Sequence, residues 1–160
     1  MLNDSSMTNS ANRIVYVDAD SCPVKEEVMS LSRLYKKEMV FVFSYAHSMV
    51  LPDDVKTAIV DTDKEAADLY LLQMTKGGDI CVTQDHALAS LLVAKGVMVL
   101  SPRGHLYKEE EMASMLDSRY LSQKARRAGK KTKGPKKFTE ADRTMFNETF
   151  ERILAKRESF

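Results

Sequence analysis

The chain has 160 residues, of which 44% are hydrophobic and 29% are charged, and its formal net charge is +1. This composition suits one soluble domain and excludes a collagen, a disulfide scaffold and a wholly disordered chain. No apolar run approaches the roughly 18 residues of a membrane span, and the opening MLNDSSMTNS does not have the pattern of a signal peptide. The two cysteines, Cys22 and Cys81, lack zinc-site spacing and fit a reducing compartment. We therefore expect a cytoplasmic protein with no membrane partner, and the sequence leaves a homo-oligomer open.

Positive and negative charges are unevenly distributed along the chain. Residues 1–118 contain 11 Lys and Arg against 18 Asp and Glu, a net charge of −7, whereas residues 119–160 contain 13 against 5, a net charge of +8. Such a basic segment can bind a polyanion or can simply be solvated. Because it opposes an acidic body, we favour nucleic acid, bound mainly through its phosphates. The cations expected to make these contacts are Arg126, Arg127, Lys130, Lys131, Lys133, Lys136 and Lys137.

Strands and helices alternate along most of the chain. Short β-branched and aromatic runs predict the strands, and apolar residues at helical spacing predict the helices. Thr62 and Glu65 have the form of a capping box, which predicts a helix start. In chain order we expect a strand at 13–18, a helix at 23–37, strands at 39–44 and 58–60, a helix at 62–75, a strand at 79–83, a helix at 85–95, a strand at 97–100, one or two helices over 108–128 and a helix at 139–156.

This alternation predicts an α/β fold with an open, mainly parallel sheet of four or five strands flanked by helices. We place the α/β domain at residues 13–118, after a flexible N-terminus at 1–12. A basic helical extension at 119–160 is expected to pack on the same domain.

Carboxylates follow the strands at the edge of the sheet where open parallel sheets bind ligands. Asp18 and Asp20 end the first strand, and Asp85 follows the strand at 79–83. Asp68 occupies an otherwise apolar helix face. Asp79 begins its strand, so it belongs to the opposite edge. Carboxylate oxygens suit Mg²⁺ or Mn²⁺, and such a cluster predicts metal-assisted hydrolysis of phosphodiesters, with all four acids as metal ligands and catalytic residues.

Simpler interpretations exist for each of these residues. Asp20 and Asp85 can cap the helices that follow them, and Asp68 can pair with Lys64. Arg103 can hold a phosphate bidentately or can be an ordinary turn residue. Cys22 has no histidine near it in sequence, which favours a small buried residue over a nucleophile.

Five segments together resemble the bacterial YaiI/YqxD family: VDADSCPVK at 17–25, EAADLYLL at 65–72, GDICVTQDHALASLL at 78–92, VLSPRG at 99–104 and KGPKKFTEADRTMF at 133–146. Its fold is similar to PIN-like nuclease domains, which implies an acidic Mg²⁺ or Mn²⁺ site and cleavage of RNA or DNA. By position, the PIN acids resemble Asp18, Asp68 and Asp85. Asp20 would be particular to this family, and Glu65 matches a further helix acid only approximately.

Two other functions remain open on sequence grounds. VDADSC also resembles the start of haloacid-dehalogenase-like phosphatases, with Asp18 as nucleophile and Asp20 as general acid and base. That chemistry normally needs a catalytic lysine and a late acidic pair, and Asp53-Asp54 comes too early to supply the pair. The other alternative is a non-enzymatic module that binds RNA or a partner through the basic segment.

Overall fold

One five-stranded sheet organises the fold of the computed structural model, which describes residues 13–63, 65–112 and 136–158. Every neighbouring pair of strands is parallel, in the spatial order β3-β2-β1-β4-β5. The predicted α/β class with an open parallel sheet is therefore confirmed. The strands are β1 (Val15–Asp18), β2 (Met39–Ser44), β3 (Lys56–Val60), β4 (Ile80–Val82) and β5 (Met98–Leu100).

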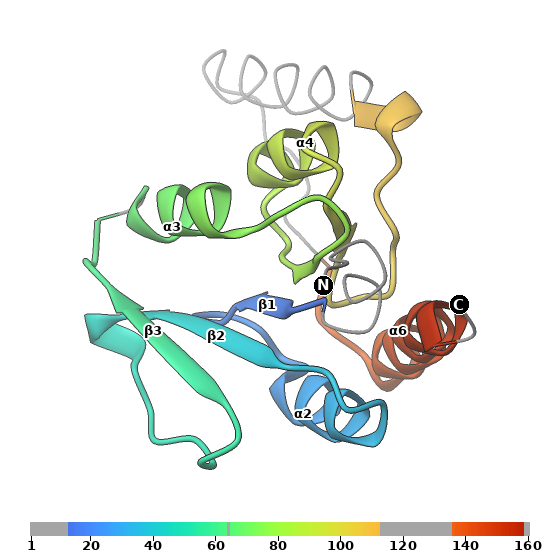
Figure 1. Ribbon diagram of the computed structural model, residues 1–160, viewed down its shortest axis with the longest axis horizontal. Coiled ribbons are helices and arrows are strands. Elements are labelled where there is room, and N and C mark those ends of the chain that lie inside the picture. Colours follow the sequence, from blue (N-terminus) through green and yellow to red (C-terminus); the bar gives the residue numbers. More distant parts are fainter. Residues whose placement is uncertain (1–12, 64, 113–135, 159–160) are drawn as a thin grey trace, which may run out of the picture.

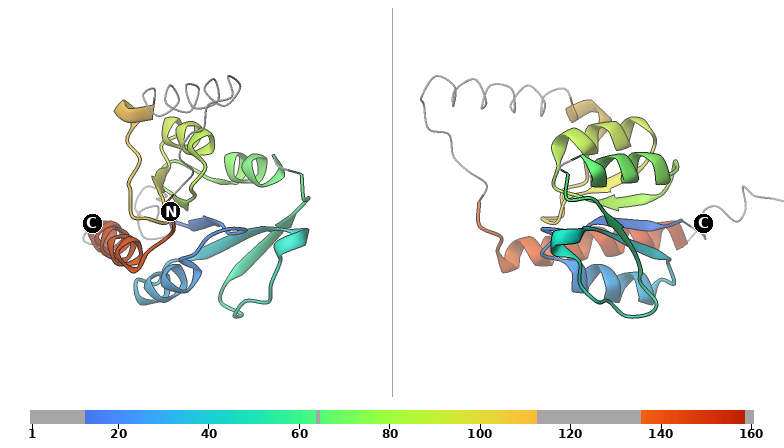
Figure 2. Two further views of the ribbon diagram at one scale, coloured as in Figure 1. Left: turned by 180° about the vertical axis from the view of Figure 1, so that it is seen from behind. Right: turned by 90° about the vertical axis from the view of Figure 1, so that its left-hand side faces the viewer.

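Helices cover both faces of the sheet and give three layers. On one face lie α3 and α4, and on the other lie α2 and α6 (Figure 1). The side view in Figure 2 shows the same layers with the sheet between them. The helices are α2 (Lys25–Leu34), α3 (Ala66–Met74), α4 (His86–Ala94) and α6 (Glu140–Glu158), and a 3-10 turn, η1 (Tyr45–His47), follows β2.

Alternating side chains of the central strand β1 supply two separate cores. Val15 and Val17 join the cluster beneath α2 and α6, whereas Tyr16 joins the cluster beneath α3 and α4. The first cluster includes the fully buried rings of Phe146 and Phe150, which stack with their centroids 5.3 Å apart. The C-terminal helix therefore completes the core on that face.

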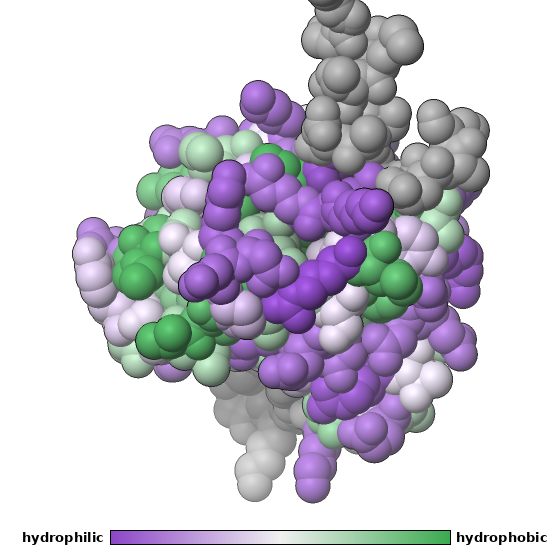
Figure 3. Space-filling view, turned by 60° about the horizontal axis from the view of Figure 1, so that its bottom comes forward, coloured by the Kyte–Doolittle hydropathy of each residue, from purple (hydrophilic) through white to green (hydrophobic). Residues whose placement is uncertain are grey.

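The outer surface of the α2 and α6 face is mainly hydrophilic. Figure 3 shows apolar side chains there only as separate patches between polar ones. Within the described residues, no helix combines the length and apolar character needed to cross a membrane.

The strand order of the sheet creates a topological switch point between β1 and β4. The chain moves outward from β1 to β2 and β3, then crosses back through α3 to place β4 on the other side of β1. Connections therefore leave β1 and β4 in opposite directions, which opens a crevice at their carboxyl ends. Residues just after these two strands are in the best position to meet a ligand.

Two helix starts differ from the sequence prediction. The predicted capping box is wrong, because α3 begins at Ala66 and the Asp63 side chain, not Thr62, accepts the Glu65 N–H at 3.3 Å. Neither Asp20 nor Ser21 caps α2, which begins at Lys25 without a side-chain cap. Both starts follow turns that the helical spacing alone does not specify.

A tight turn after β5 lies directly beneath α6. Gly104 has φ +89°, and a Cβ at this position would lie 2.7 Å from the backbone carbonyl carbon of Met145. Only glycine fits this combination of backbone conformation and clearance. The turn thus fixes where α6 crosses the edge of the sheet. Most of the region where helices were expected over 108–128 lies outside the described residues, as do the domain boundaries near 12 and 118.

Candidate active site

Asp18 is the last residue of β1 and lies at the switch point. Its half-buried carboxylate accepts a hydrogen bond from the Thr83 hydroxyl at 2.9 Å, just beyond β4. Burial raises the pKa of Asp18, the Thr83 bond lowers it, and the nearby carboxylates of Asp85 and Asp20 raise it further. The net effect is a raised pKa of Asp18, which means that its ionised form is energetically unfavourable here. A bound cation would offset that cost.

Thr83 links the two strand ends through one oxygen. Its Oγ1 donates to Asp18 and accepts the backbone N–H of Asp85 at 3.1 Å. The Asp85 side chain in turn accepts the Leu88 N–H at 3.1 Å and caps α4, as predicted. This cap orients the Asp85 carboxylate at the carboxyl end of β4.

Asp20 is held by the end of β2 rather than by a helix. Its Oδ1 accepts the Ser44 N–H at 2.8 Å, and its Oδ2 lies 3.5 Å from His47 Nδ1. The same imidazole nitrogen lies 3.1 Å from Ser44 Oγ. The carboxylate is therefore positioned at the edge of the sheet by Ser44, which lies 24 residues further along the chain, and by His47 beyond it.

Asp68 approaches the site from the first turn of α3. Its side chain is half-buried. The charges of Asp68 and Asp18 both influence the pKa of the buried Cys81 thiol in β4. Burial is the largest cause that raises the Cys81 pKa well above its usual value, and the two carboxylates raise it further. Its suggested partner Lys64 lies outside the described residues.

Asp20 and Asp85 both raise the Asp18 pKa, and Asp68 and Asp18 both raise the Cys81 pKa, but the four predicted acids do not form a finished metal cage. Within residues 13–63, 65–112 and 136–158, no group of three His, Cys, Asp or Glu side chains is arranged to hold an ion. The chemistry of the donors nevertheless fits a hard cation, because among the described groups that shift the Asp18 pKa the charged ones are carboxylates. Asp18, Asp20, Asp68 and Asp85 are the residues that would hold Mg²⁺ or Mn²⁺.

Cys22 is buried next to this site. Burial is the main cause that raises its pKa to about 11, although a backbone hydrogen bond and Lys25 oppose the shift. The thiol is therefore protonated near neutral pH, which agrees with the interpretation of a small buried residue.

Arg103 anchors the C-terminal helix. Its Nη1 lies 2.6 Å from Asp142 Oδ2, and the guanidinium also donates to the carbonyls of Lys136 and Lys137. The Phe138 ring contacts two cations, with its centroid 5.7 Å from the Arg103 guanidinium carbon and 5.1 Å from that of Arg143. The charge of Arg103 is thus engaged within the protein.

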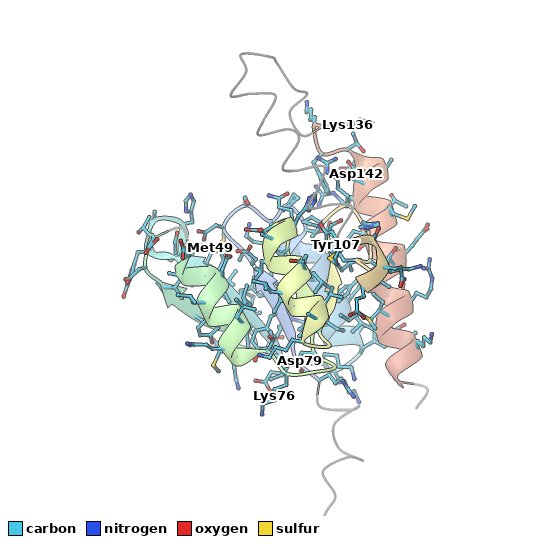
Figure 4. All side chains as sticks on the ribbon, turned by 90° about the horizontal axis from the view of Figure 1, so that it is seen from above. Met49, Lys76, Asp79, Tyr107, Lys136 and Asp142 are labelled. Carbon is cyan, nitrogen blue, oxygen red and sulfur yellow. The ribbon has the colours of Figure 1, made fainter. Side chains whose placement is uncertain are left out.

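The described end of the basic segment lies at the carboxyl edge of the sheet. In Figure 4, Lys136 and Asp142 appear at the opposite end of the molecule from Asp79 and Lys76, which mark the amino end of β4. Lys136 and Lys137 are exposed. The other predicted phosphate-binding cations, Arg126, Arg127, Lys130, Lys131 and Lys133, lie outside the described residues.

Sequence reasoning gave no role to Thr83, Ser44 or His47. Ser44 ends β2 and Thr83 directly follows β4, both at the same edge as Asp18, and His47 follows in η1. The sequence prediction selected the carboxylates that end or follow a strand. Including hydroxyl and imidazole side chains at the same positions would have found these three residues. Their pairing with Asp18 and Asp20 depends on strand order, which the sequence does not state.

Next to the carboxylates an open pocket of about 480 Å³ lies beyond the ends of β4 and β5. Residues on both sides of Asp85, namely Gln84 and His86, form one wall. Arg103, His105 and Tyr107 form the other. The pocket and the carboxylates therefore share the loop that follows β4.

The fold and this edge define a class: an α/β protein with a parallel sheet and acidic side chains at its switch point. Comparison with known proteins gives the family. Residues 16–156 match the family described as "Uncharacterized BCR, YaiI/YqxD family", so the chain belongs to the YaiI/YqxD family, as the sequence resemblance indicated.

Similar proteins have related names. The chain is 70% identical to UPF0178 protein ABC1688 of Shouchella clausii over 146 residues, which cover 91% of this chain and 95% of that protein. It is 49% identical to UPF0178 protein BH1374 of Halalkalibacterium halodurans, with 89% and 91% covered. It is 46% identical to UPF0178 protein Lmo1456 of Listeria monocytogenes, with 88% and 94% covered. No solved structure gives a significant match.

Proposed function

We infer that this protein is a divalent-metal-dependent nuclease that hydrolyses phosphodiester bonds, with RNA favoured over DNA. The proposal rests on one observation: a half-buried Asp18 at the switch point, whose pKa is raised by burial and by two further carboxylates. Clustered like charges that raise a pKa are typical of functional sites rather than of packing. The resemblance to PIN-like nuclease domains agrees with this interpretation but does not establish it.

Each acid has a separate means of support. Thr83 orients Asp18, the Ser44 N–H orients Asp20, and the cap of α4 fixes Asp85. When bound, Mg²⁺ or Mn²⁺ supplies a Lewis acid for the phosphate and a source of hydroxide near neutral pH. The protein's own contribution is a set of oxygen donors that hydrogen bonds orient before substrate arrives.

Cations at the same edge favour a polyanionic substrate. Lys136 and Lys137 are exposed there, and Arg103 and Phe138 hold the backbone beside them. Phosphate contacts from lysines increase affinity without reading sequence. We therefore expect binding that weakens with salt and depends little on base sequence.

The test titrates Mn²⁺ and Mg²⁺ into the protein by calorimetry, with labelled single-stranded RNA and DNA incubated in parallel. The variant is Asp18→Asn/Asp85→Asn, because asparagine still accepts the Thr83 bond and still caps α4. Asp53→Asn/Glu148→Gln is the matched control, since it removes the same charge at exposed positions. We expect saturable metal binding and RNA cleavage in the wild type and the control, and neither in the site variant.

Three results would contradict this function. Absence of metal binding at millimolar concentration would leave the carboxylates as caps and hydrogen-bond acceptors. Rapid hydrolysis of a small phosphomonoester with a trapped aspartyl-phosphate at Asp18 would indicate the phosphatase. Salt-sensitive RNA binding that needs no metal and is unchanged by Asp18→Asn would indicate a non-enzymatic binding module.

A further inference from the structure

The pocket beyond β4 and β5 has features that phosphodiester hydrolysis itself does not require. Its volume of about 480 Å³ is within the usual range of small-molecule sites. Three of its lining residues have aromatic or imidazole rings: His86, His105 and Tyr107. Such a lining suits a flat ring better than it suits a phosphate.

These rings are held in a defined arrangement. The His105 and Tyr107 rings meet edge to face with centroids 5.1 Å apart, and the His86 and Tyr107 rings meet in the same manner at 5.7 Å. Tyr107 is buried, and its N–H donates to the Val99 carbonyl in β5 at 2.9 Å. Tyr107 is thus held in place by the fold, and the exposed rings of His86 and His105 both pack against it.

His105 and His86 are themselves tied to the fold. The His105 N–H donates to Ser101 Oγ at 3.1 Å, and its Nε2 lies 3.0 Å from Glu111 Oε1. His86 is the first residue of α4, directly after the capping Asp85. The His105 ring, fixed in this way, loses little freedom when a ligand stacks on it.

The pocket is continuous with the carboxylate site through the loop after β4. Asp85 lies between two lining residues, and its charge is felt at the Tyr107 hydroxyl as one of the causes that raise the Tyr107 pKa. Gln84 spans toward β1, where its Nε2 donates to Ser21 Oγ at 3.0 Å. A nucleotide whose phosphate lies at a cation held by Asp18 and Asp85 would therefore have its base near the pocket.

We propose that this pocket binds the nucleobase adjacent to the scissile phosphate by stacking on His86 and His105, a substrate contact that rests on the proposed nuclease function. Histidine rings stack on unpaired bases in single-stranded nucleic acid. Because every base has a stacking face, such contacts tolerate different sequences. The pocket therefore selects unpaired over paired strands, since a base within a duplex is not free to enter it.

The test uses uncharged nucleosides, which cannot bind through a metal ion or through the lysines. Adenosine, guanosine, cytidine and uridine are titrated into the full chain in EDTA, and the imidazole C–H resonances of the three histidines are followed by NMR. We expect saturable shifts at His86 and His105 and none at His47, which lies beside Asp20 outside the pocket. Absence of shifts at His86 and His105, or equal shifts at His47, would overturn the proposal.

Variants test the same contact. His86→Ala/His105→Ala should weaken nucleoside binding by at least about fivefold. Tyr45→Ala, which removes an aromatic ring that is 66% exposed outside the pocket, should not weaken it. If the alanine variant loses its folded circular dichroism spectrum, His86→Gln/His105→Gln keeps polar side chains of similar reach and should show the same loss. Unchanged affinity in a folded variant would overturn the proposal.

Cleavage measurements separate this proposal from the proposed function. If the protein cleaves single-stranded RNA, the histidine variant should lower kcat/KM at least about fivefold while metal affinity stays unchanged. Cleavage with no response to the variant and no nucleoside shifts would overturn the pocket and leave the nuclease. Nucleoside shifts without cleavage at any metal concentration would overturn the nuclease and show that the pocket takes a free nucleoside or nucleotide.

Discussion

Two aspartates at opposite edges of the same sheet meet very different surroundings. At the amino edge, Asp79 is buried and each of its oxygens accepts a backbone N–H, from Ile14 at 3.1 Å and from Lys76 at 2.9 Å. At the carboxyl edge, Asp18 accepts one hydroxyl and lies near two more carboxylates. The hydrogen bonds of Asp79 stabilise the fold. The ionised carboxylate of Asp18 instead lowers folding stability, an arrangement that is typical of functional sites.

The largest expected effect tests the stabilising edge. Asp79→Ala removes the acceptor for two backbone N–H groups and should lower the free energy of unfolding by about 3 kcal/mol. Urea denaturation measures the loss. A cost below about 1 kcal/mol would mean that water replaces the carboxylate and that the two edges differ less than their hydrogen bonds indicate.

Thr83→Val tests the link between Asp18 and Asp85. The buried hydroxyl is lost from both the Asp18 carboxylate and the Asp85 N–H, so the free energy of unfolding should fall by about 1–2 kcal/mol. If Asp18 holds a metal ion as proposed, metal affinity should fall by about 10-fold, because the group that orients this carboxylate is gone. Thr83→Ser keeps the hydroxyl and is the control. Equal metal affinity in the two variants would contradict the orienting role.

Asp18→Asn should have the opposite sign to Asp79→Ala. Because the pKa of Asp18 is higher in the folded than in the unfolded chain, the ionised carboxylate lowers stability above that pKa and has no such cost below the unfolded pKa. The variant should raise the melting temperature at pH 7 by about 2–4 °C without metal. The gain should disappear near pH 3. A lower melting temperature at pH 7 would show that Asp18, like Asp79, stabilises the fold.

The smallest expected effect concerns Asp142, a carboxylate at the same edge that pairs with the cation Arg103. The hydrogen bond from the Thr139 N–H is the largest cause that lowers its pKa, and Arg103 lowers it further. Its contribution to stability is present above the unfolded pKa and is lost as the pH falls through the folded pKa. Asp142→Asn should speed amide exchange in the first turn of α6 at neutral pH, with a difference that vanishes in acid. Equal exchange at pH 7 would assign the anchoring to Phe138 and the apolar contacts alone.

Strand and helix positions were predictable because they depend on local residue patterns. The run VYVD and the apolar spacing of α4 identify their elements without reference to the rest of the chain. The α4 cap was predictable for the same reason, since Asp85 and Leu88 are three residues apart.

Partners distant in sequence could not be predicted. A helix cap was one of the roles open to Asp20, but its carboxylate accepts the N–H of Ser44, which belongs to another strand. Thr83 and Asp18 meet across 65 residues, and that contact depends on β4 pairing with β1. In each case the sheet order decides the contact.

The ion pair between Arg143 of α6 and Glu27 of α2 joins residues 116 positions apart, at a distance of 2.8 Å. The cluster on the α3 and α4 face forms from residues within 14–112, but the opposite cluster also needs Phe146 and Phe150. A contact that closes so long a loop loses more chain entropy before it gains any burial. The two faces should therefore form in sequence during folding, with the α3 and α4 face first, and docking of α6 should limit the rate of the last step.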